Sequence, residues 1–243
     1  MTVQGLLSGI GLGKRFGPVE VLRGVDVSVA PGEALGVVGP NGAGKTTLFG
    51  VLAGTLPASC GQVFFGGREV TSLPAAMRCR QGIARTHQVP RPFLGMTVFE
   101  NTLVAVQHGA LARGTRADDL AAQALARTGL LALANRPAAT LGLLDRKRLE
   151  LARALATQPQ VLLLDEIGGG LTEAELHLLI ELVGSLRREG LALVWIEHVL
   201  HALLQVVDRL MCLAEGRVIA HGTPHDVMAD QAVVQAYLGG VAA

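Results

Sequence analysis

The segment Gly39–Thr46 has the residue types and the spacing of a phosphate-binding loop. It reads Gly-Pro-Asn-Gly-Ala-Gly-Lys-Thr, which matches the pattern G-x-x-x-x-G-K-[ST] at every fixed position. Glycines in such a loop let successive backbone N–H groups point at a phosphate, and the N-terminus of the following helix adds partial positive charge. Lys45 would supply a charge to the β- and γ-phosphates, and the Thr46 hydroxyl could ligate Mg²⁺. We therefore predict a nucleotide-phosphate site, although a chance match is the alternative in a chain with 31 glycines.

Two further apolar runs end in residues that could complete a hydrolytic site. Val161–Leu164 is followed directly by Asp165 and Glu166, and Leu191–Ile196 is followed, one residue later, by His198. Asp165 would contribute to a magnesium shell, and Glu166 would polarise an attacking water. Each signal is weak alone, because a strand can end in acidic residues and a lone histidine is more often structural. Together with an upstream phosphate loop they indicate a nucleotide hydrolase.

Short apolar runs alternate with helical patterns around these residues, which predicts an α/β fold on a mostly parallel sheet. The segment from Pro90 to Gln158 has a helical pattern instead, so we expect a helical insert in the α/β core. The predicted elements are strands at 25–29, 34–38, 161–164 and 191–196, a hairpin of 211–214 with 217–220, a helix at 45–53 ended by Gly54, a helix that begins at a Thr172–Glu175 capping box and ends at Gly190, and insert helices that include a Thr97–Glu100 start and the stretches 117–128 and 146–157.

Composition excludes several classes of protein. Of the 243 residues, half are hydrophobic and 17% are charged, and the net charge of +1 leaves no electrostatic footprint for nucleic acid. No run approaches the roughly 18 apolar residues of a membrane span, and no signal peptide is visible, which predicts a cytosolic protein that sits against a partner. Cys60, Cys79 and Cys212 are too widely spaced for a zinc site or a disulfide framework, so we expect small buried side chains in a reducing compartment.

These motifs resemble those of ABC-transporter ATP-binding subunits, and the resemblance covers essentially the whole chain. The phosphate loop, Gln88, the run Arg146–Leu155, the segment Leu162–Glu166 and His198 occur in that family's order and at its spacing. The segments 88–93, 95–98, 219–224 and 236–239 further resemble the importer group for branched-chain (hydrophobic) amino acids. The resemblance implies one domain, 1–243, with a P-loop (RecA-like) core at 1–89 and 159–243, an antiparallel β subdomain, and an α-helical subdomain at 90–158.

The resemblance also implies roles for single residues, with ATP and Mg²⁺ as cofactors. Phe16 would stack on adenine, with ordinary core packing as the alternative. Gln88 would reach the magnesium shell or the attacking water and sense the membrane partner, with a plain surface glutamine as the alternative. Glu166, His198 and Lys45 would be catalytic, with His198 touching the γ-phosphate. The phosphate-site residues would be Gly39, Pro40, Asn41, Gly42, Ala43, Gly44, Lys45, Thr46 and Thr47, and the metal ligands would be Thr46, Gln88 and Asp165.

The chain departs from the family at its signature motif. The gapless run Arg146–Leu155 places the family's Leu-Ser-Gly-Gly-Gln on Leu141-Gly142-Leu143-Leu144-Asp145. The serine hydroxyl that should meet a γ-phosphate is missing at Gly142, a leucine replaces glycine at Leu144, and Asp145 adds a negative charge near a polyphosphate. In the family each ATP lies between one subunit's phosphate loop and the other's signature. We therefore expect a heterodimer whose second ATP-binding subunit has an intact signature.

The function that the resemblance implies is the ATPase of an importer for branched-chain or other small hydrophobic amino acids. Its implied partners are transmembrane permease subunits and, indirectly, a periplasmic solute-binding protein, with no nucleic acid. Its implied place is the cytoplasmic face of the inner (plasma) membrane. Three alternatives stay open: another cargo such as urea, amides or lipopolysaccharide; a non-transport ABC protein; and a weakly hydrolysing regulatory subunit.

Overall fold

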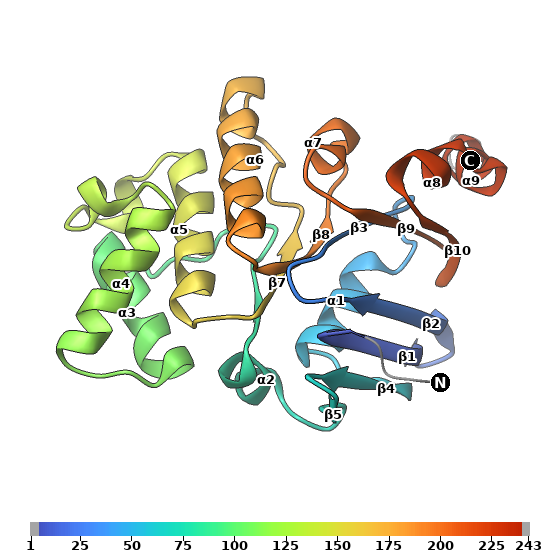
Figure 1. Ribbon diagram of the computed structural model, residues 1–243, viewed down its shortest axis with the longest axis horizontal. Helices are drawn as coiled ribbons and strands as arrows, with labels where there is room; N and C mark the ends of the chain where they lie inside the picture. Colours follow the sequence, from blue (N-terminus) through green and yellow to red (C-terminus); the bar gives the residue numbers. More distant parts are fainter. Residues whose placement is uncertain (1–4, 240–243) are drawn as a thin grey trace.

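Two β-sheets form the body of the molecule in the computed structural model, which describes residues 5–239 (Figure 1). The smaller sheet is antiparallel, with the order β2-β1-β4-β5. The larger has the order β10-β9-β3-β8-β7-β6, and all its pairings are parallel except that of β10 with β9. The strands are β1 (Leu7–Phe16), β2 (Val19–Val29), β3 (Ala34–Val38), β4 (Cys60–Phe65), β5 (Arg68–Glu69), β6 (Ile83–Arg85), β7 (Val161–Asp165), β8 (Ala192–Ile196), β9 (Arg209–Ala214) and β10 (Arg217–Gly222).

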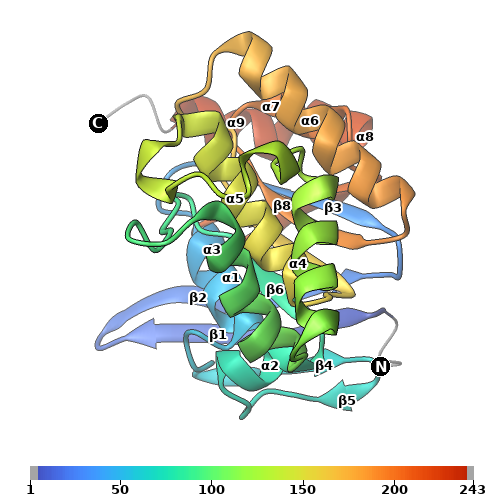
Figure 2. The ribbon, with the colours of Figure 1, turned by 90° about the vertical axis from the view of Figure 1, so that its left-hand side faces the viewer.

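Helices cover the sheets and build a separate block at one end. α3, α4 and α5 form that block, on the left of Figure 1 and in front of the sheets in Figure 2. The helices are α1 (Lys45–Ala53), α2 (Ala75–Gln81), α3 (Val98–Ala105), a π-helical turn η1 (Val106–Ala110), α4 (Thr115–Arg127), the short 3₁₀ turns η2 (Leu131–Leu133) and η3 (Ala138–Thr140), α5 (Leu143–Ala156), α6 (Glu173–Arg188), α7 (Leu200–Leu204), α8 (Pro224–Ala229) and α9 (Gln231–Gly239).

The predicted fold class is confirmed, and so are most of the predicted elements. The helix Lys45–Ala53 has the predicted bounds, with Gly54 in the left-handed conformation at its end. Both predicted capping boxes are formed, at Thr97 and at Thr172. Hydrogen bonds from the backbone and hydroxyl of Thr172 lower the pKa of Glu175, so this cap loses strength as the pH falls through that lowered pKa.

Some element boundaries differ from the prediction. The helix expected from Arg146 begins three residues earlier, at Leu143, because Gly142 is its N-cap in extended backbone. The strand expected at 25–29 begins at Val19, because β2 pairs with β1 along its length. The sequence interpretation missed β1 itself, in which Gly9, Gly11 and Gly13 interrupt the alternation of apolar residues that marks a strand.

The buried strands β3, β7 and β8 lead to the predicted site residues at one edge of the larger sheet. Val38, Leu162 and Leu164 pack into one core cluster, whereas Val37 and Leu163 pack into the other, on the opposite face of the sheet. A parallel sheet covered on both faces accounts for these continuous apolar runs. The register pairs residue 37 with residue 196 and residue 165 with residue 196, so β3, β7 and β8 end at one edge. Residues that directly follow these strands must therefore meet there.

The expectation that all three cysteines are buried is wrong. Cys212 is buried in β9, but Cys79 is only partly buried and Cys60 is exposed at the start of β4. Cys60 precedes Val63 by three positions in β4, so alternation along the strand places it on the opposite face from Val63 and Phe65, which enter the core. Within residues 5–239, no helix has both the length and the apolar character needed to cross a membrane.

Candidate functional site

The phosphate loop joins β3 to α1 through a backbone that only glycine can adopt at two of its positions. Gly39 has φ +144°, and a Cβ there would come within 2.0 Å of the carbonyl oxygen of Leu213. Gly44 has φ +104°, and a Cβ there would come within 2.9 Å of a methyl group of Leu22. The loop is thus pressed against β9 and β2. It delivers the free N–H groups of the first turn of α1 to the edge of the sheet, a geometry that suits a phosphate group.

The Lys45 side chain lies inside this loop and is almost completely buried. Its Nζ donates to the carbonyl oxygen of Gly39 at 2.7 Å and to that of Pro40 at 3.0 Å. Burial lowers the pKa of Lys45, while the charges of Glu166 and Asp165 oppose that shift. This cation is buried at an energetic cost and is hydrogen-bonded only to neutral carbonyl groups. An anionic ligand would offset that cost, so the site favours anion binding.

Glu166 lies at the centre of a hydrogen-bonded trio with Gln88 and His198. The Nε2 of Gln88 donates to Oε2 of Glu166, and Nε2 of His198 lies 2.7 Å from Oε1 of the same carboxylate. The side chain of Glu166 is 13% exposed and that of His198 is 47% exposed, and Gln88 is exposed as well, so solvent reaches both outer members of the trio. The structure thus brings together three residues that the sequence analysis had placed in one site.

The backbone at Glu166 is unusual for a residue with a side chain. It has φ +47°, in the left-handed region, and its N–H donates to the carbonyl oxygen of Ile196 at 2.9 Å. Such a conformation costs roughly 1–3 kcal/mol in a residue other than glycine and persists only where the surroundings hold it. This turn, directly after β7, aims the carboxylate at Gln88 and His198 instead of along the strand.

Asp165 has a partner that the sequence analysis missed. The Nη2 of Arg85, at the end of the neighbouring strand β6, lies 2.6 Å from Oδ2 of Asp165. The two side chains are 14% and 4% exposed, so the ion pair offsets the cost of burying the carboxylate. Register explains why no local pattern revealed it: Arg85 pairs with Leu163 on β7, two residues before Asp165, and only sheet assembly joins them.

The residues predicted to hold magnesium are oxygen donors of the right kind. The Thr46 hydroxyl is exposed at the start of α1, and Asp165 has a second carboxylate oxygen beyond the one that Arg85 contacts. Gln88 keeps its carbonyl oxygen, since only its amide nitrogen contacts Glu166. Among the described residues, no three His, Cys, Asp or Glu side chains gather as a metal site. Mg²⁺ is usually held by few protein ligands, and phosphates and water complete its coordination shell. The oxygens of Thr46, Asp165 and Gln88 fit this arrangement.

Phe16 lies at the end of β1 with its ring largely accessible. It is 47% exposed, which contradicts the alternative that it is ordinary core packing. The buried ammonium of Lys14 lies 5.0 Å from the ring centroid and donates to the carbonyl oxygen of Pro57 at 2.8 Å. An accessible aromatic ring can stack on a planar base, so the exposure of Phe16 is consistent with the predicted contact with adenine.

The altered signature segment forms the start of α5. Gly142 is the N-cap of α5 and, having no side chain, makes no capping hydrogen bond. The next residue, Leu143, is exposed. Asp145 lies in the first turn, where the helix dipole favours an acid, and it is 3.5 Å from Arg148. Asp145 thus has an adequate structural role, while nothing in the segment replaces the missing serine hydroxyl.

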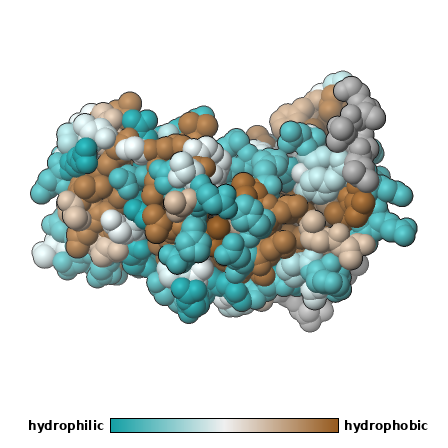
Figure 3. Space-filling view, turned by 90° about the horizontal axis from the view of Figure 1, so that it is seen from above, coloured by the Kyte–Doolittle hydropathy of each residue, from teal (hydrophilic) through white to brown (hydrophobic). Residues whose placement is uncertain are grey.

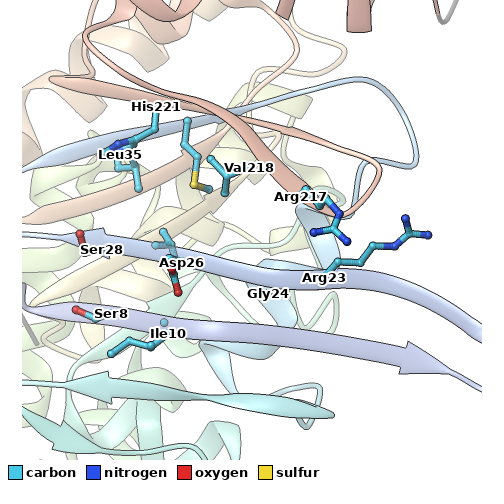
Figure 4. Close-up of a pocket in the computed structure, with 13 residues that line it drawn as sticks. Ser8, Ile10, Arg23, Gly24, Asp26, Ser28, Leu35, Arg217, Val218 and His221 are labelled. Atoms are coloured by element: carbon cyan, nitrogen blue, oxygen red, sulfur yellow. The ribbon is translucent and has the colours of Figure 1, made fainter. Parts of the chain in front are cut away.

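A cavity of about 650 Å³ lies apart from these residues, between the strands β1 and β2 and the hairpin β9–β10 (Figure 4). None of the predicted nucleotide-site residues is among those that line it. Its lining includes Arg23, Asp26, Leu35, Arg217, Val218 and His221.

Comparison with protein families yields two matches. Residues 22–168 match the model described as "ABC transporter", and residues 217–243 match the model described as "Branched-chain amino acid ATP-binding cassette transporter". The first match contains the phosphate loop and the Asp165–Glu166 pair, and the second contains α8 and α9.

Individual relatives and solved structures match over nearly the full length. The chain is 38% identical to the high-affinity branched-chain amino acid transport ATP-binding protein LivG of Escherichia coli (strain K12), covering 97% of this chain and 98% of LivG. It is 34% identical to the lipopolysaccharide export system ATP-binding protein LptB of Acidithiobacillus ferridurans, covering 96% and 97%. The crystal structure of the ADP conformation of MJ1267, an ATP-binding cassette of an ABC transporter, superposes with a TM-score of 0.86 at 30% identity, covering 98% and 100%.

Proposed function

The chain belongs to the ABC-transporter ATP-binding family, whose members are ATPases that drive transport, and on that premise we propose that it powers an importer of branched-chain or other small hydrophobic amino acids. The observation that carries the proposal is the match of residues 217–243 to the branched-chain model. The phosphate loop and the acidic pair would bind and hydrolyse ATP whatever the transported solute is. Only segments outside these motifs can therefore indicate which solute is transported.

The geometry supports a role for each residue around the nucleotide. Lys45 and the N–H groups of the loop would bind the phosphates, and Phe16 would stack on the adenine ring. Mg²⁺, held by oxygens of Thr46, Asp165 and Gln88, would neutralise charge on the phosphates. Glu166 would accept a proton from the attacking water.

The remaining members of the site would support that proton transfer. Gln88 and His198 would hold the Glu166 carboxylate in place, since each contacts one of its two oxygens. His198 is also exposed enough to contact the γ-phosphate. Because Gln88 and His198 are both exposed, an attacking water could reach the Glu166 carboxylate from solvent.

The segment between Gln88 and α3 is suited to contact a membrane partner. It exposes four apolar side chains, and Figure 3 shows further apolar residues on the surface over the helical block. Because Gln88 contacts the carboxylate of Glu166, a permease that moves this segment would change the geometry at the catalytic base. We propose docking of the permease here, at the cytoplasmic face of the membrane. The four side chains are Val89, Phe93, Leu94 and Met96.

Uptake measurements test the cargo. In cells that lack this chain, uptake of labelled leucine, isoleucine and valine is expected to fall, because the importer would lose its ATPase. Re-expression of the intact chain should restore uptake, and re-expression of Glu166→Gln should not. Unchanged uptake of all three amino acids would contradict the proposal. A loss of urea, amide or lipopolysaccharide transport instead would identify a different cargo, a possibility that the likeness to LptB keeps open.

We further propose that the working ATPase is a heterodimer. The chain's own phosphate loop, Glu166 and His198 are complete, whereas its signature segment lacks the groups that would contact a partner's ATP. Pairing with a subunit whose signature is intact would yield one competent site and one weakened site. Two copies of this chain would have two weakened sites.

Restoring three of the four altered signature positions, with Leu143 left in place, is expected to activate the chain on its own. The triple variant Gly142→Ser, Leu144→Gly, Asp145→Gln should raise the ATPase rate of the isolated chain by about 10-fold or more, since a single lost donor to developing phosphate charge can cost about 10²-fold. Steady-state phosphate release at equal protein concentration measures this. Leu131→Ala, an exposed leucine elsewhere in the helical block, is the control.

The outcome decides between the pairing models. If the unaltered chain already hydrolyses ATP as fast as the triple variant, the heterodimer proposal is wrong. Low activity in the triple variant as well would favour a regulatory subunit that hydrolyses little.

A further inference from the structure

The C-terminal helix α9 reaches the phosphate loop through one side chain. The hydroxyl of Tyr237 accepts a hydrogen bond from the backbone N–H of Gly39 at 2.9 Å, across 198 residues of sequence. β3 ends at Val38, so this N–H is the first one beyond the strand. Gly39 is buried, and a buried N–H without an acceptor is costly. The tyrosine hydroxyl therefore supplies the hydrogen-bond acceptor that the sheet does not provide for this N–H.

Helix α9 is fixed firmly enough to hold this contact. Val233 is buried in the main core, and Tyr237 follows it by four residues, so both lie on the same face of the helix. The start of α9 is held by Asp230, whose Oδ1 accepts the N–H of Ala232 at 2.7 Å. Figure 1 shows α8 and α9 together beside β9 and β10, next to the sheet edge from which the phosphate loop departs.

Gly39 is held on both sides of its Cα. Its N–H is bonded to Tyr237, and its carbonyl oxygen accepts the Lys45 ammonium at 2.7 Å. Its backbone is also packed so closely against Leu213 that it has no room for a Cβ. The Tyr237 hydroxyl and the Lys45 ammonium are thus linked through one residue, and the tyrosine helps to set where the chain turns into the loop.

The phenol is a suitable neutral acceptor. Burial raises the pKa of Tyr237, with the Gly39 hydrogen bond opposing part of that rise, so the hydroxyl stays protonated at physiological pH. A protonated hydroxyl accepts one hydrogen bond and keeps its own proton for another acceptor.

We propose that Tyr237 is a positioning residue of the nucleotide site, holding the Val38–Gly39 peptide in the orientation that a phosphate-bound loop requires. The inference rests on the proposed role of that loop. Without the hydroxyl, the nucleotide-free loop can turn the Gly39 N–H toward water, and this relaxation must be reversed when nucleotide binds. The C-terminal segment would then act on ATP affinity as well as on folding.

The variant Tyr237→Phe tests this by removing one oxygen atom. The KM for ATP and the dissociation constant for MgADP are expected to rise by about 10-fold, the size of effect that an unsatisfied buried N–H can produce. The value of kcat at saturating ATP should change by less than a factor of about two, because Glu166 and its partners are untouched. Val234→Ala, an exposed residue on the same helix, should leave both constants unchanged.

A structural role alone would have a different signature. It would lower the melting temperature of Tyr237→Phe and leave its nucleotide affinity equal to that of the unaltered chain, and this result would overturn the proposal. Lys45→Ala separates failure of the inference from failure of the proposed function. If the unaltered chain binds MgADP no better than Lys45→Ala, the loop assignment itself fails.

Tyr237 is the chain's single tyrosine, which permits a direct observation. Protein labelled with 3-fluorotyrosine should give one ¹⁹F resonance. We expect it to shift when MgADP saturates the unaltered chain and to stay in place in Lys45→Ala. A resonance that does not move while MgADP is shown to bind would contradict a link between Tyr237 and the phosphate loop.

Discussion

Replacing Glu166 by glutamine is expected to lower ATP turnover by about 10²- to 10⁴-fold, the usual contribution of a general base. Glutamine has nearly the same shape as glutamate, so the left-handed turn after β7 and the contact with His198 can persist. The amide cannot accept a proton from water. Binding of MgATP should therefore stay close to that of the unaltered chain while hydrolysis is lost.

Two measurements on the same protein check this result. Phosphate release under saturating MgATP measures turnover, and equilibrium titration with a fluorescent ATP analogue measures binding. Glu173→Gln is the matched control, because Glu173 is an exposed acid at the start of α6. Near-normal turnover in Glu166→Gln would remove Glu166 from the role of base.

The same variant also reports on pairing. Light scattering during size-exclusion chromatography measures its mass with MgATP and with MgADP. A nucleotide-loaded monomer in MgATP is the expected result, because the segment Gly142–Asp145 lacks the groups that would close a pair. A dimer that forms in ATP but not in ADP would show that this signature still clamps a γ-phosphate, and the argument for a heterodimer would lose its main support.

Replacing Lys45 by alanine is expected to weaken nucleotide binding by about 10²- to 10³-fold, since hydrogen bonds to charged groups contribute roughly 1.5–3 kcal/mol each and Lys45 would contact two phosphates. Folding should survive, because the buried ammonium contacts only loop carbonyls in the nucleotide-free chain. Isothermal titration with MgADP measures the affinity. Arg113→Ala, which removes an exposed cation, should bind like the unaltered chain.

The affinity that Lys45 provides should also depend on pH. Burial lowers its pKa in the nucleotide-free protein, and a bound polyphosphate would raise it. The protonated form therefore binds nucleotide better, so affinity should fall as the pH rises through the lowered pKa. The alanine variant should lack this part of the pH dependence. An identical pH profile in both proteins would be evidence against a charged Lys45 at the phosphates.

The phosphate loop, the helix that follows it and the strands that carry the predicted catalytic residues can all be read from the sequence alone. The loop motif spans eight consecutive residues, and its glycines, lysine and threonine are required by local backbone geometry and by phosphate chemistry. The helix Lys45–Ala53 and the two capping boxes were predicted for the same reason, since their hydrogen bonds join residues three or four positions apart. The apolar strands were also readable, because burial on both faces leaves a continuous run.

Which side chains meet at the sheet edge depends on how the strands and helices pack together. Glu166 contacts Gln88 and His198 because three strand ends align, a consequence of register that no local pattern encodes. The ion pair of Arg85 with Asp165 likewise exists only once β6 lies beside β7. The hydrogen bond from Gly39 to Tyr237 joins residues 198 positions apart. Nothing in the sequence of a C-terminal helix indicates that its tyrosine hydroxyl accepts a hydrogen bond from so distant an N–H group. Each of these contacts depends on the packing of the whole chain, and for that reason composition and periodicity could not reveal them.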